Sequence, residues 1–195
     1  PNLTEQLART RADLRMGVPV VLTGSTSVLV LAAETLTTAR LTEALALGEQ
    51  PVLAITARRA TTLKARAYDG DLARISLPRD ASLRWVRAIA DPADDLHHPM
   101  KGPLASERNG DTDPHRTAIA LCKSARLLPS AVVVPLNDAL RFATTHNLTA
   151  LPLHNLTDLI NQSSPLHPIV AARLPIEAAD AGRLHIFRPE NGGEE

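Results

Sequence analysis

The sequence predicts a layered α/β domain in which helices cover a mixed β-sheet. Short apolar runs alternate with segments whose apolar residues recur at helical spacing, from residue 3 to about residue 160. The chain has 195 residues, 44% of them hydrophobic, which is enough for one domain with a substantial core. Only 2% of the residues are aromatic, so this core must be packed from Ala, Leu, Val and Ile.

The apolar pattern places the elements in order. A first helix is expected over residues 3–16, where Gly17 follows in the position of a C-terminal glycine. Strands are expected at 18–22, 28–33, 51–56, 72–77, 131–136, 149–153, 169–175 and 184–187. Further helices are expected after Thr37, ending at Gly48, in the basic stretch from residue 57, and after a cap at Asp80. Another is expected from Asp113 and Pro114 to about residue 127. The last two are expected after a cap at Asn137 or Asp138 and after a cap at Asn155.

Charge and cysteine content narrow the class of protein. Basic and acidic residues both number 21, so no net field draws the chain to nucleic acid or to an anionic membrane, and neither is expected as a partner. No apolar run approaches the roughly 20 residues needed to span a bilayer. Cys122 is the single cysteine, which excludes an internal disulfide and indicates a reducing compartment, most simply the cytoplasm.

The segment 91–136 carries the densest group of residues with chemical potential. Three histidines and two aspartates of this segment have side chains that suit a transition metal: His97, His98, His115, Asp94 and Asp95. Their spacing matches no standard zinc signature, which favours a solvated loop over a metal site. Asp94 and Asp95 have two interpretations, a general acid and base pair or a polar loop and helix cap.

Other candidates each have a structural alternative. Cys122 is either a nucleophile activated by His115 or a small buried packing residue, and its apolar helix face favours the second. The basic residues of the stretch after residue 57 either bind a phosphate or form a solvated helix face, and they are Arg58, Arg59, Lys64 and Arg66. Trp85, the only tryptophan, is expected in half-buried packing.

Five segments carry a family resemblance. In order they read GVPVVL, LVLAAETLTTARL, DPADDLHHP, PHRTAIALCKSARLLPSAVV and ALRFATTHNLTALPLHNLTDLI. Over about residues 10–160 they resemble 3,4-dihydroxy-2-butanone-4-phosphate synthase. The resemblance implies a three-layer α/β sandwich, a homodimer, and an ancestral site in which magnesium serves the rearrangement of ribulose 5-phosphate.

The catalytic motifs of that family do not carry over. Its acidic metal-binding loop corresponds to residues 23–27, Thr-Gly-Ser-Thr-Ser. Its Gly-His-Thr-Glu-Ala motif falls on residues 114–118, where His115 and Ala118 are kept and Thr117 replaces the glutamate. Its Asp-Arg-Ala-Thr-Thr motif aligns with residues 81–85 and is not kept, and its Pro-Gly-His motif aligns with residues 99–101, where Pro99 alone is kept. The resemblance therefore implies no catalytic residue, no cofactor and no metal site in this segment, with His115, Asp94 and Asp95 as vestigial candidates.

A second resemblance begins near residue 166. The stretch IVAARLPIEAADAGRLHIFRPENGGEE resembles the opening strands of GTP cyclohydrolase II. We therefore expect a degenerate synthase-like domain over 1–165, a linker and first strands of a hydrolase module over 166–195, and a longer parent protein in which that module follows. Zinc is expected only in the part that follows.

The two resemblances together predict the non-catalytic amino-terminal domain of a GTP cyclohydrolase II homologue in riboflavin biosynthesis. Its role would be dimerisation, structural support or regulation. Two alternatives stay open: an enzyme with residual sugar-phosphate lyase chemistry, and a domain that senses a metabolite such as GTP or a flavin.

Overall fold

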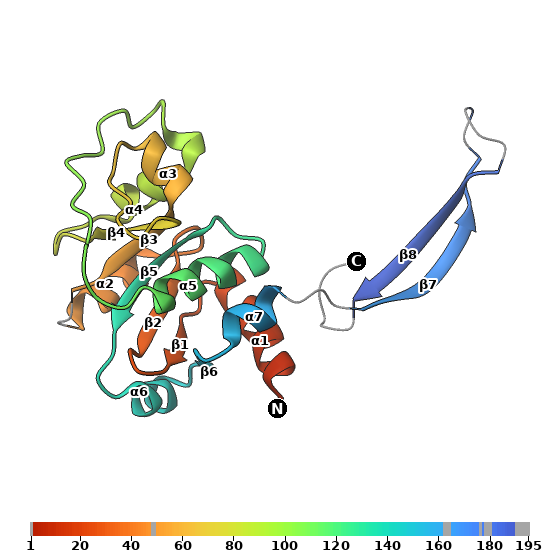
Figure 1. Ribbon diagram of the computed structural model, residues 1–195, viewed down its shortest axis with the longest axis horizontal. Coiled ribbons are helices and arrows are strands. Elements are labelled where there is room, and N and C mark those ends of the chain that lie inside the picture. The colour runs from red at the N-terminus through yellow and green to blue at the C-terminus, as the bar shows by residue number, and fades with distance from the viewer. Residues whose placement is uncertain (1, 48–49, 162–164, 176, 178–180, 190–195) are drawn as a thin grey trace.

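The computed structural model describes residues 2–47, 50–161, 165–175, 177 and 181–189. Six strands form one mixed sheet: β1 (Val20–Thr23), β2 (Val28–Ala32), β3 (Val52–Thr56), β4 (Leu72–Ser76), β5 (Ser130–Pro135) and β6 (Ala150–Pro152). Their order is β4-β3-β5-β2-β1-β6, with β1 and β6 parallel and the other neighbours antiparallel. Figure 1 shows this sheet at the centre of the body.

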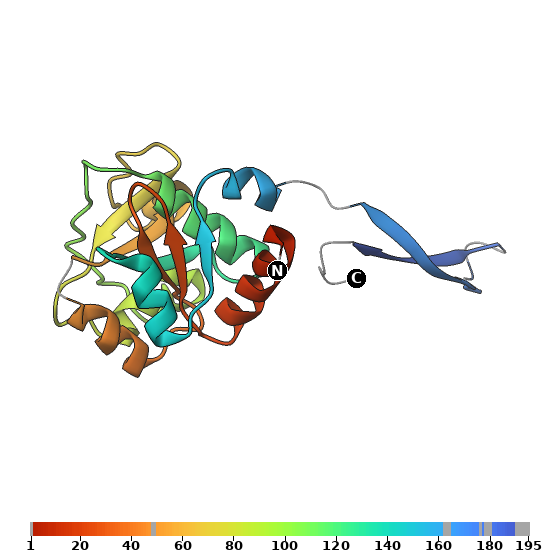
Figure 2. The ribbon, with the colours of Figure 1, turned by 90° about the horizontal axis from the view of Figure 1, so that it is seen from below.

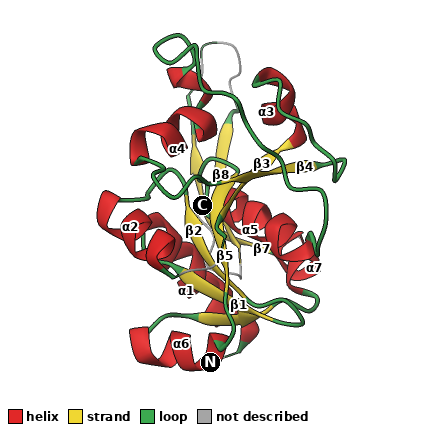
Figure 3. Ribbon diagram, turned by 90° about the vertical axis from the view of Figure 1, so that its left-hand side faces the viewer, coloured by secondary structure: helices red, strands yellow, loops and turns green. Residues whose placement is uncertain are grey.

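Helices cover both faces of this sheet. They are α1 (Leu3–Arg15), α2 (Thr38–Ala46), α3 (Ala57–Thr62), α4 (Leu83–Ala90), α5 (Asp113–Ser124), α6 (Ala139–His146) and α7 (Leu156–Asn161), with a short 3₁₀ turn η1 (Pro92–Asp94) after α4. Figure 3 shows α2, α4 and α6 on one side of the sheet, and α5 and α7 on the other. The predicted layered α/β fold with a mixed sheet is confirmed.

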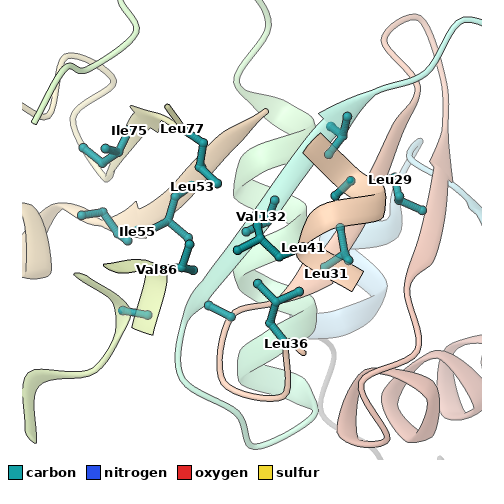
Figure 4. Packing of buried hydrophobic residues seen from close by; sticks show 14 of the residues in the cluster. Leu29, Leu31, Leu36, Leu41, Leu53, Ile55, Ile75, Leu77, Val86 and Val132 are labelled. Carbon is teal, nitrogen blue, oxygen red and sulfur yellow. The ribbon is translucent and has the colours of Figure 1, made fainter. Parts of the chain in front are cut away.

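The alternation of side chains along each strand builds two cores. Val21, Leu53 and Val132 point into the layer of α2, α4 and α6, whereas Val20 and Val133 point into the layer of α1, α5 and α7. Because successive strand residues face opposite sides, the apolar runs fill both layers at once. Figure 4 shows the first core, which is built almost entirely from aliphatic side chains.

The helix ends follow the sequence with two corrections. Thr37 and Asp138 cap α2 and α6 as predicted, each accepting a backbone N–H of the first turn. The Asp80 cap is wrong: Ser82 caps α4, because its hydroxyl accepts the N–H of Trp85 at 3.2 Å. Asp113 is not a cap either, since it is the first residue of α5 and its carboxylate accepts from Arg116 instead.

Further predicted helix ends lie close to their expected places. Gly17 has a φ of +73° directly after α1, and a side chain there would meet the carbonyl oxygen of Thr35 at 2.7 Å, so the position requires glycine. The predicted end of α2 at Gly48 lies outside the described residues. Helix α7 follows Asn155 as expected.

Two strands beyond residue 165 form a separate antiparallel pair. They are β7 (Leu166–Arg173) and β8 (Arg183–Pro189), which pair only with each other among the described strands. Figure 2 shows them as a twisted two-stranded ribbon, and nearly all of their side chains are exposed. Across the described residues, no helix combines the length and the apolar character needed to cross a membrane.

Candidate functional site

His115 lies on the first turn of α5 with only 9% of its surface exposed. Its Nδ1 atom is buried and has no hydrogen-bond partner among the described residues. Burial, and next the nearby charge of Arg74, lower the pKa of His115 from 6.5 to about 4, although Asp111 and Asp69 act in the opposite direction. His115 is therefore a neutral imidazole at pH 7.

A buried ion pair lies beside His115. Arg74, in the middle of β4, is 4% exposed and donates to both carboxylate oxygens of Asp69 at 2.8 and 3.1 Å. Its remaining nitrogen donates to the carbonyl oxygen of Asn109 at 2.8 Å. The segment leading to α5 is also fastened along β4, where the N–H of Glu107 donates to the carbonyl of Arg74 at 2.8 Å.

A pocket of about 530 Å³ opens next to the start of α5. It is lined from the β1–β2 turn, the first turns of α5, and the segment around α7. The lining residues are Gly24, Ser25, Asp111, Asp113, Arg116, Thr117, Leu153, His154, Asn155, Thr157 and Asp158. The pocket thus joins the turn and the helix start on which the sequence resemblance places the family's metal-binding motifs.

Thr117, which the sequence resemblance aligns with the family's glutamate, already has a partner. Its hydroxyl oxygen lies 2.9 Å from that of Thr157 on α7, which ties the two helices together. Across the pocket, the β1–β2 turn is closed on itself, because the N–H of Gly24 donates to the hydroxyl of Ser27 at 3.1 Å. Residues 23–27 and Thr117, which the resemblance aligns with the family's carboxylates, include no Asp or Glu.

Two of the three aspartates that line this pocket already accept hydrogen bonds from within the chain. Magnesium requires hard oxygen ligands in near-octahedral array, usually including carboxylates. The carboxylate of Asp111 accepts the N–H of Asp113 at 3.0 Å, and that of Asp113 accepts from Arg116 at 2.9 Å. Within the part of the chain that the structure describes, no group of three His, Cys, Asp or Glu residues is placed to hold a metal.

Arg116 is the arginine of this pocket, and each of its three side-chain nitrogens has a hydrogen-bond partner. It binds both carboxylate oxygens of Asp71 at 2.7 and 2.9 Å and reaches Asp113 and Thr112 with another nitrogen. The hydrogen bond with Arg116 lowers the pKa of Asp71, and the same bond raises the pKa of Arg116. Arg116 therefore holds the start of α5 to the start of β4.

Asp95 belongs to a different region, where it binds two cations. Arg59 donates to its two oxygens at 2.6 and 2.7 Å, and Lys101 also pairs with it. These bonds hold the pKa of the Asp95 carboxyl far below its usual range. The loop interpretation of Asp95 therefore needs one correction, since it is a half-buried ion-pair partner. The side chain of Asp94 lies outside the part that the structure describes.

The solvated-face interpretation of the basic stretch is wrong at Arg59. This residue is 9% exposed and also donates to the backbone carbonyls of Ala88, Ile89 and Asp91. Arg58 beside it is exposed, as predicted. Arg59 therefore joins α3 to the end of α4, where it has a structural role.

His98 and His115 of the central segment have different neighbours. His98 accepts a hydrogen bond from Arg84 at 2.6 Å, in a loop that Trp85 also holds through the carbonyl of Lys101 at 3.2 Å. His115 lies elsewhere, beside Arg74. Trp85 is half-buried, as predicted.

Cys122 is fully buried on α5. Its thiol donates weakly to the carbonyl of Ser130 at 3.6 Å, and burial raises its pKa to about 12. A protonated and enclosed thiol is not a nucleophile at neutral pH, so the packing interpretation holds.

Sequence reasoning missed the buried pair of Arg74 and Asp69 and the exposed pair of Arg116 and Asp71. A signal for Arg74 was available, because a charged residue in the middle of the apolar run LARISL needs a partner once the strand is buried. No local signal identifies Asp71, which is 45 residues from Arg116.

Comparison with solved structures identifies the architecture. A two-domain 3,4-dihydroxy-2-butanone 4-phosphate synthase from A. baumannii superposes with a TM-score of 0.59 at 15% identity, covering 99% of this chain and 67% of that one. The fold is that of a 3,4-dihydroxy-2-butanone 4-phosphate synthase. The synthase of Candida albicans gives a TM-score of 0.57 at 13% identity, over 79% of this chain and 96% of its own.

The synthase-like chain also has a curated relative. It is 32% identical over 153 residues to a GTP cyclohydrolase-2 from Azospirillum brasilense, an alignment that covers 76% of this chain. The chain spans 40% of the length of that relative. No protein-family model matches the sequence.

Proposed function

We propose that the synthase-like body, residues 3–161, is a non-catalytic domain that supports or regulates a GTP cyclohydrolase II module following it in the same protein. The observation that carries the proposal is the contact between Thr117 and Thr157. At the position of the family's glutamate, a hydroxyl fastens two helices together, opposite a turn without a carboxylate.

The charge of the pocket supports this proposal. A pentulose phosphate carries a dianionic phosphate and needs unsatisfied cationic donors. The pocket offers the carboxylates of Asp111, Asp113 and Asp158, and its one arginine is bound to Asp71 and Asp113. Binding such an anion would require Arg116 to abandon two charge-assisted contacts, which are the stronger class of hydrogen bond.

The alternative of residual lyase chemistry rests on His115. A general base must come within hydrogen-bond reach of the proton that it removes. His115 is nine-tenths buried and is not among the residues that line the pocket. This geometry favours a structural histidine over a base.

Thermal unfolding with magnesium and ribulose 5-phosphate tests the proposal. A ligand present at about 100 times its Kd stabilises the native state by about 2.7 kcal/mol, which raises the Tm of a domain of this size by several degrees. We expect no change of Tm with magnesium, with the sugar phosphate, or with both. A dose-dependent rise that needs both would contradict the proposal.

A second candidate function is the sensing of a metabolite, favoured by the pocket of about 530 Å³. Volumes of this order accommodate small metabolites. Isothermal titration calorimetry with GTP and with a flavin separates this candidate from a purely structural role, and the carboxylates that disfavour a sugar phosphate also make GTP the less favoured of the two ligands. Saturable binding that disappears in Ser25→Trp, a change that fills the pocket from the β1–β2 turn, would establish sensing.

The proposal has three further parts, which concern the oligomeric state, the domain boundary and the compartment. The domain forms a homodimer, residues 166–195 begin the hydrolase module with a boundary near 165, and the protein works in the cytoplasm. The single, fully buried thiol of Cys122 is compatible with a reducing compartment. Sedimentation equilibrium of the chain gives its oligomeric state directly, and a monomer at micromolar concentration would remove the dimer.

A further inference from the structure

Next to the turn, over residues 170–174 and 183–186, the strand pair β7–β8 has two chemically different faces. Directly paired residues lie on the same face of an antiparallel pair. One face carries a continuous aliphatic set, Val170, Ala172, Leu174, Leu184 and Ile186, given by the pairs Val170 with Ile186 and Ala172 with Leu184. The opposite face carries the pairs Arg173 with Arg183 and Ala171 with His185 next to the turn, and the pair Pro168 with Phe187 at the far end. The stacking of His185 on Phe187, at 6.3 Å between ring centroids, places those two side chains together on the second face.

The two outer edges of the pair also differ. The N–H of Leu174 donates to the carbonyl of Gly182 at 2.9 Å, so these two residues form a hydrogen-bonded pair. Hydrogen-bonded and non-hydrogen-bonded pairs alternate along an antiparallel ladder. The pair of Ala171 with His185 is therefore of the second kind, and the N–H of each points outward from the ladder.

The outer edge of β7 is poorly suited to another strand. Pro168 has no N–H to donate, and the register shifts between Pro168 and Val170. Proline and bulges are typical of edge strands, where they block further pairing. Between Arg183 and Arg188, β8 has neither feature and offers regular outward N–H groups.

An isolated two-stranded pair with an exposed aliphatic face is marginal in water. Val170 is 52% exposed, Leu184 is 48% exposed and Leu174 is 43% exposed. We propose that β8 is an inner strand of a larger sheet, in which the polypeptide following residue 195 adds a third strand along its outer edge and covers the aliphatic face. This inference rests on the proposed function, because that polypeptide is the hydrolase module.

The comparison with the two-domain structure supports the following polypeptide as the source of the third strand. That structure covers 99% of this chain, the strand pair included, and a third of its own length lies outside the superposition. The curated relative likewise exceeds the aligned part, which is 40% of its length. The third strand is therefore assigned to the same polypeptide and not to a separate protein. The hydrogen-exchange experiment below distinguishes it from a strand of a second copy of this chain.

A matched pair of proline substitutions tests whether the outer edge of β8 pairs with another strand. They are made in the protein that includes the polypeptide after residue 195. His185→Pro and Ala171→Pro remove outward N–H groups from the two members of one residue pair. We expect His185→Pro to lower the Tm of the following module by several degrees and Ala171→Pro to leave it unchanged. Equal effects, or the reverse order, would overturn the assignment of β8 as the inner strand.

A second matched pair tests the face. Ala172 and Ala171 are neighbours on opposite faces, so Ala172→Asp places a carboxylate against the proposed core and Ala171→Asp places the same group on the other face. We expect only Ala172→Asp to unfold or destabilise the module. The same loss in both variants, or in neither, would overturn the assignment of the faces.

Amide hydrogen exchange separates this inference from the proposed function. In the longer protein, the amides of Arg183, His185 and Phe187 should exchange at least tenfold more slowly than in the 195-residue chain. If these amides are protected but the longer protein releases no formate from GTP, the proposed hydrolase function is wrong and the proposed third strand still holds. Protection that appears in the 195-residue chain itself and rises with its concentration would assign the edge to a second copy and overturn the proposal.

Discussion

The guanidinium of Arg59 and the carboxylate of Asp95 form a two-point ion pair, with contacts of 2.6 and 2.7 Å, that ties α3 to the loop after α4. Arg59 is also bound to three backbone carbonyls, so its charge is satisfied on every side. The aspartate that resembles a remnant of an active site is thus part of the framework.

Removal of the Asp95 carboxylate should be costly. Asp95→Ala leaves the charge of Arg59 buried without its main partner, and breaking a buried ion pair from one side costs about 3–5 kcal/mol. Because Asp95 is 29% exposed, we expect the lower part of that range. Urea unfolding measures the change, with Arg58→Ala as the exposed neighbouring control. Equal stabilities of Asp95→Ala and the control would contradict the role of the pair.

The hydroxyl pair of Thr117 and Thr157 should show coupling. Thr117→Val and Thr157→Val each remove one partner of a bond that contributes about 1 kcal/mol. The double variant should lose less than the sum of the two single variants, because the second change finds no bond left to break. A double-mutant cycle in urea gives this difference, and strict additivity would show that the contact carries no energy.

His115 should make the fold sensitive to acid. Its folded-state pKa of about 4 lies below the unfolded value of 6.5, so the unfolded chain binds more protons between these values. Stability is therefore lost as the pH falls from 6.5 to 4, by up to about 3 kcal/mol from this one group. Its contribution is fully present above pH 6.5.

The variant His115→Gln isolates that effect, because its side chain does not titrate. Urea unfolding of both proteins at pH 7, 6, 5 and 4 should show the wild type losing stability relative to the variant at each step. A constant difference across this range would show that the imidazole does not titrate differently in the two states.

Cys122 should be inert in the native protein. Its thiol is enclosed and its pKa is raised to about 12, so almost no thiolate forms at pH 8. Ellman's reagent should detect no thiol before denaturation and one thiol afterwards in urea. Rapid reaction in the native state would show that the α5 layer opens easily.

Much of the fold could be predicted because it depends on local patterns. The strands are visible in the sequence as apolar runs, and their side chains fill both layers. Thr37 and Asp138 cap their helices through contacts with residues three positions away. The sequence favours Asp80 as the cap of α4, whereas Ser82 has that position, because the path of the chain decides which capping residue reaches the first turn. The paired layers themselves follow from the alternation of side chains along the strands.

The site was less predictable because its contacts are distant in sequence. Asp95 binds Arg59, which is 36 residues away in the sequence, and Thr117 contacts Thr157, which is 40 residues away. A basic run such as ARRATTLKAR gives no indication of which arginine is buried, since that depends on where the end of α4 comes to lie. In contrast, the sequence itself shows that residues 23–27, which the resemblance aligns with the family's acidic loop, contain no carboxylate.

The central claim is that the synthase-like domain does not catalyse the family's reaction. The most direct measurement is formate release from ribulose 5-phosphate by the purified chain with excess magnesium, run beside an active 3,4-dihydroxy-2-butanone-4-phosphate synthase. We predict no formate above the protein-free rate. Formate release that scales with protein concentration, requires magnesium and is abolished by His115→Gln would contradict the account.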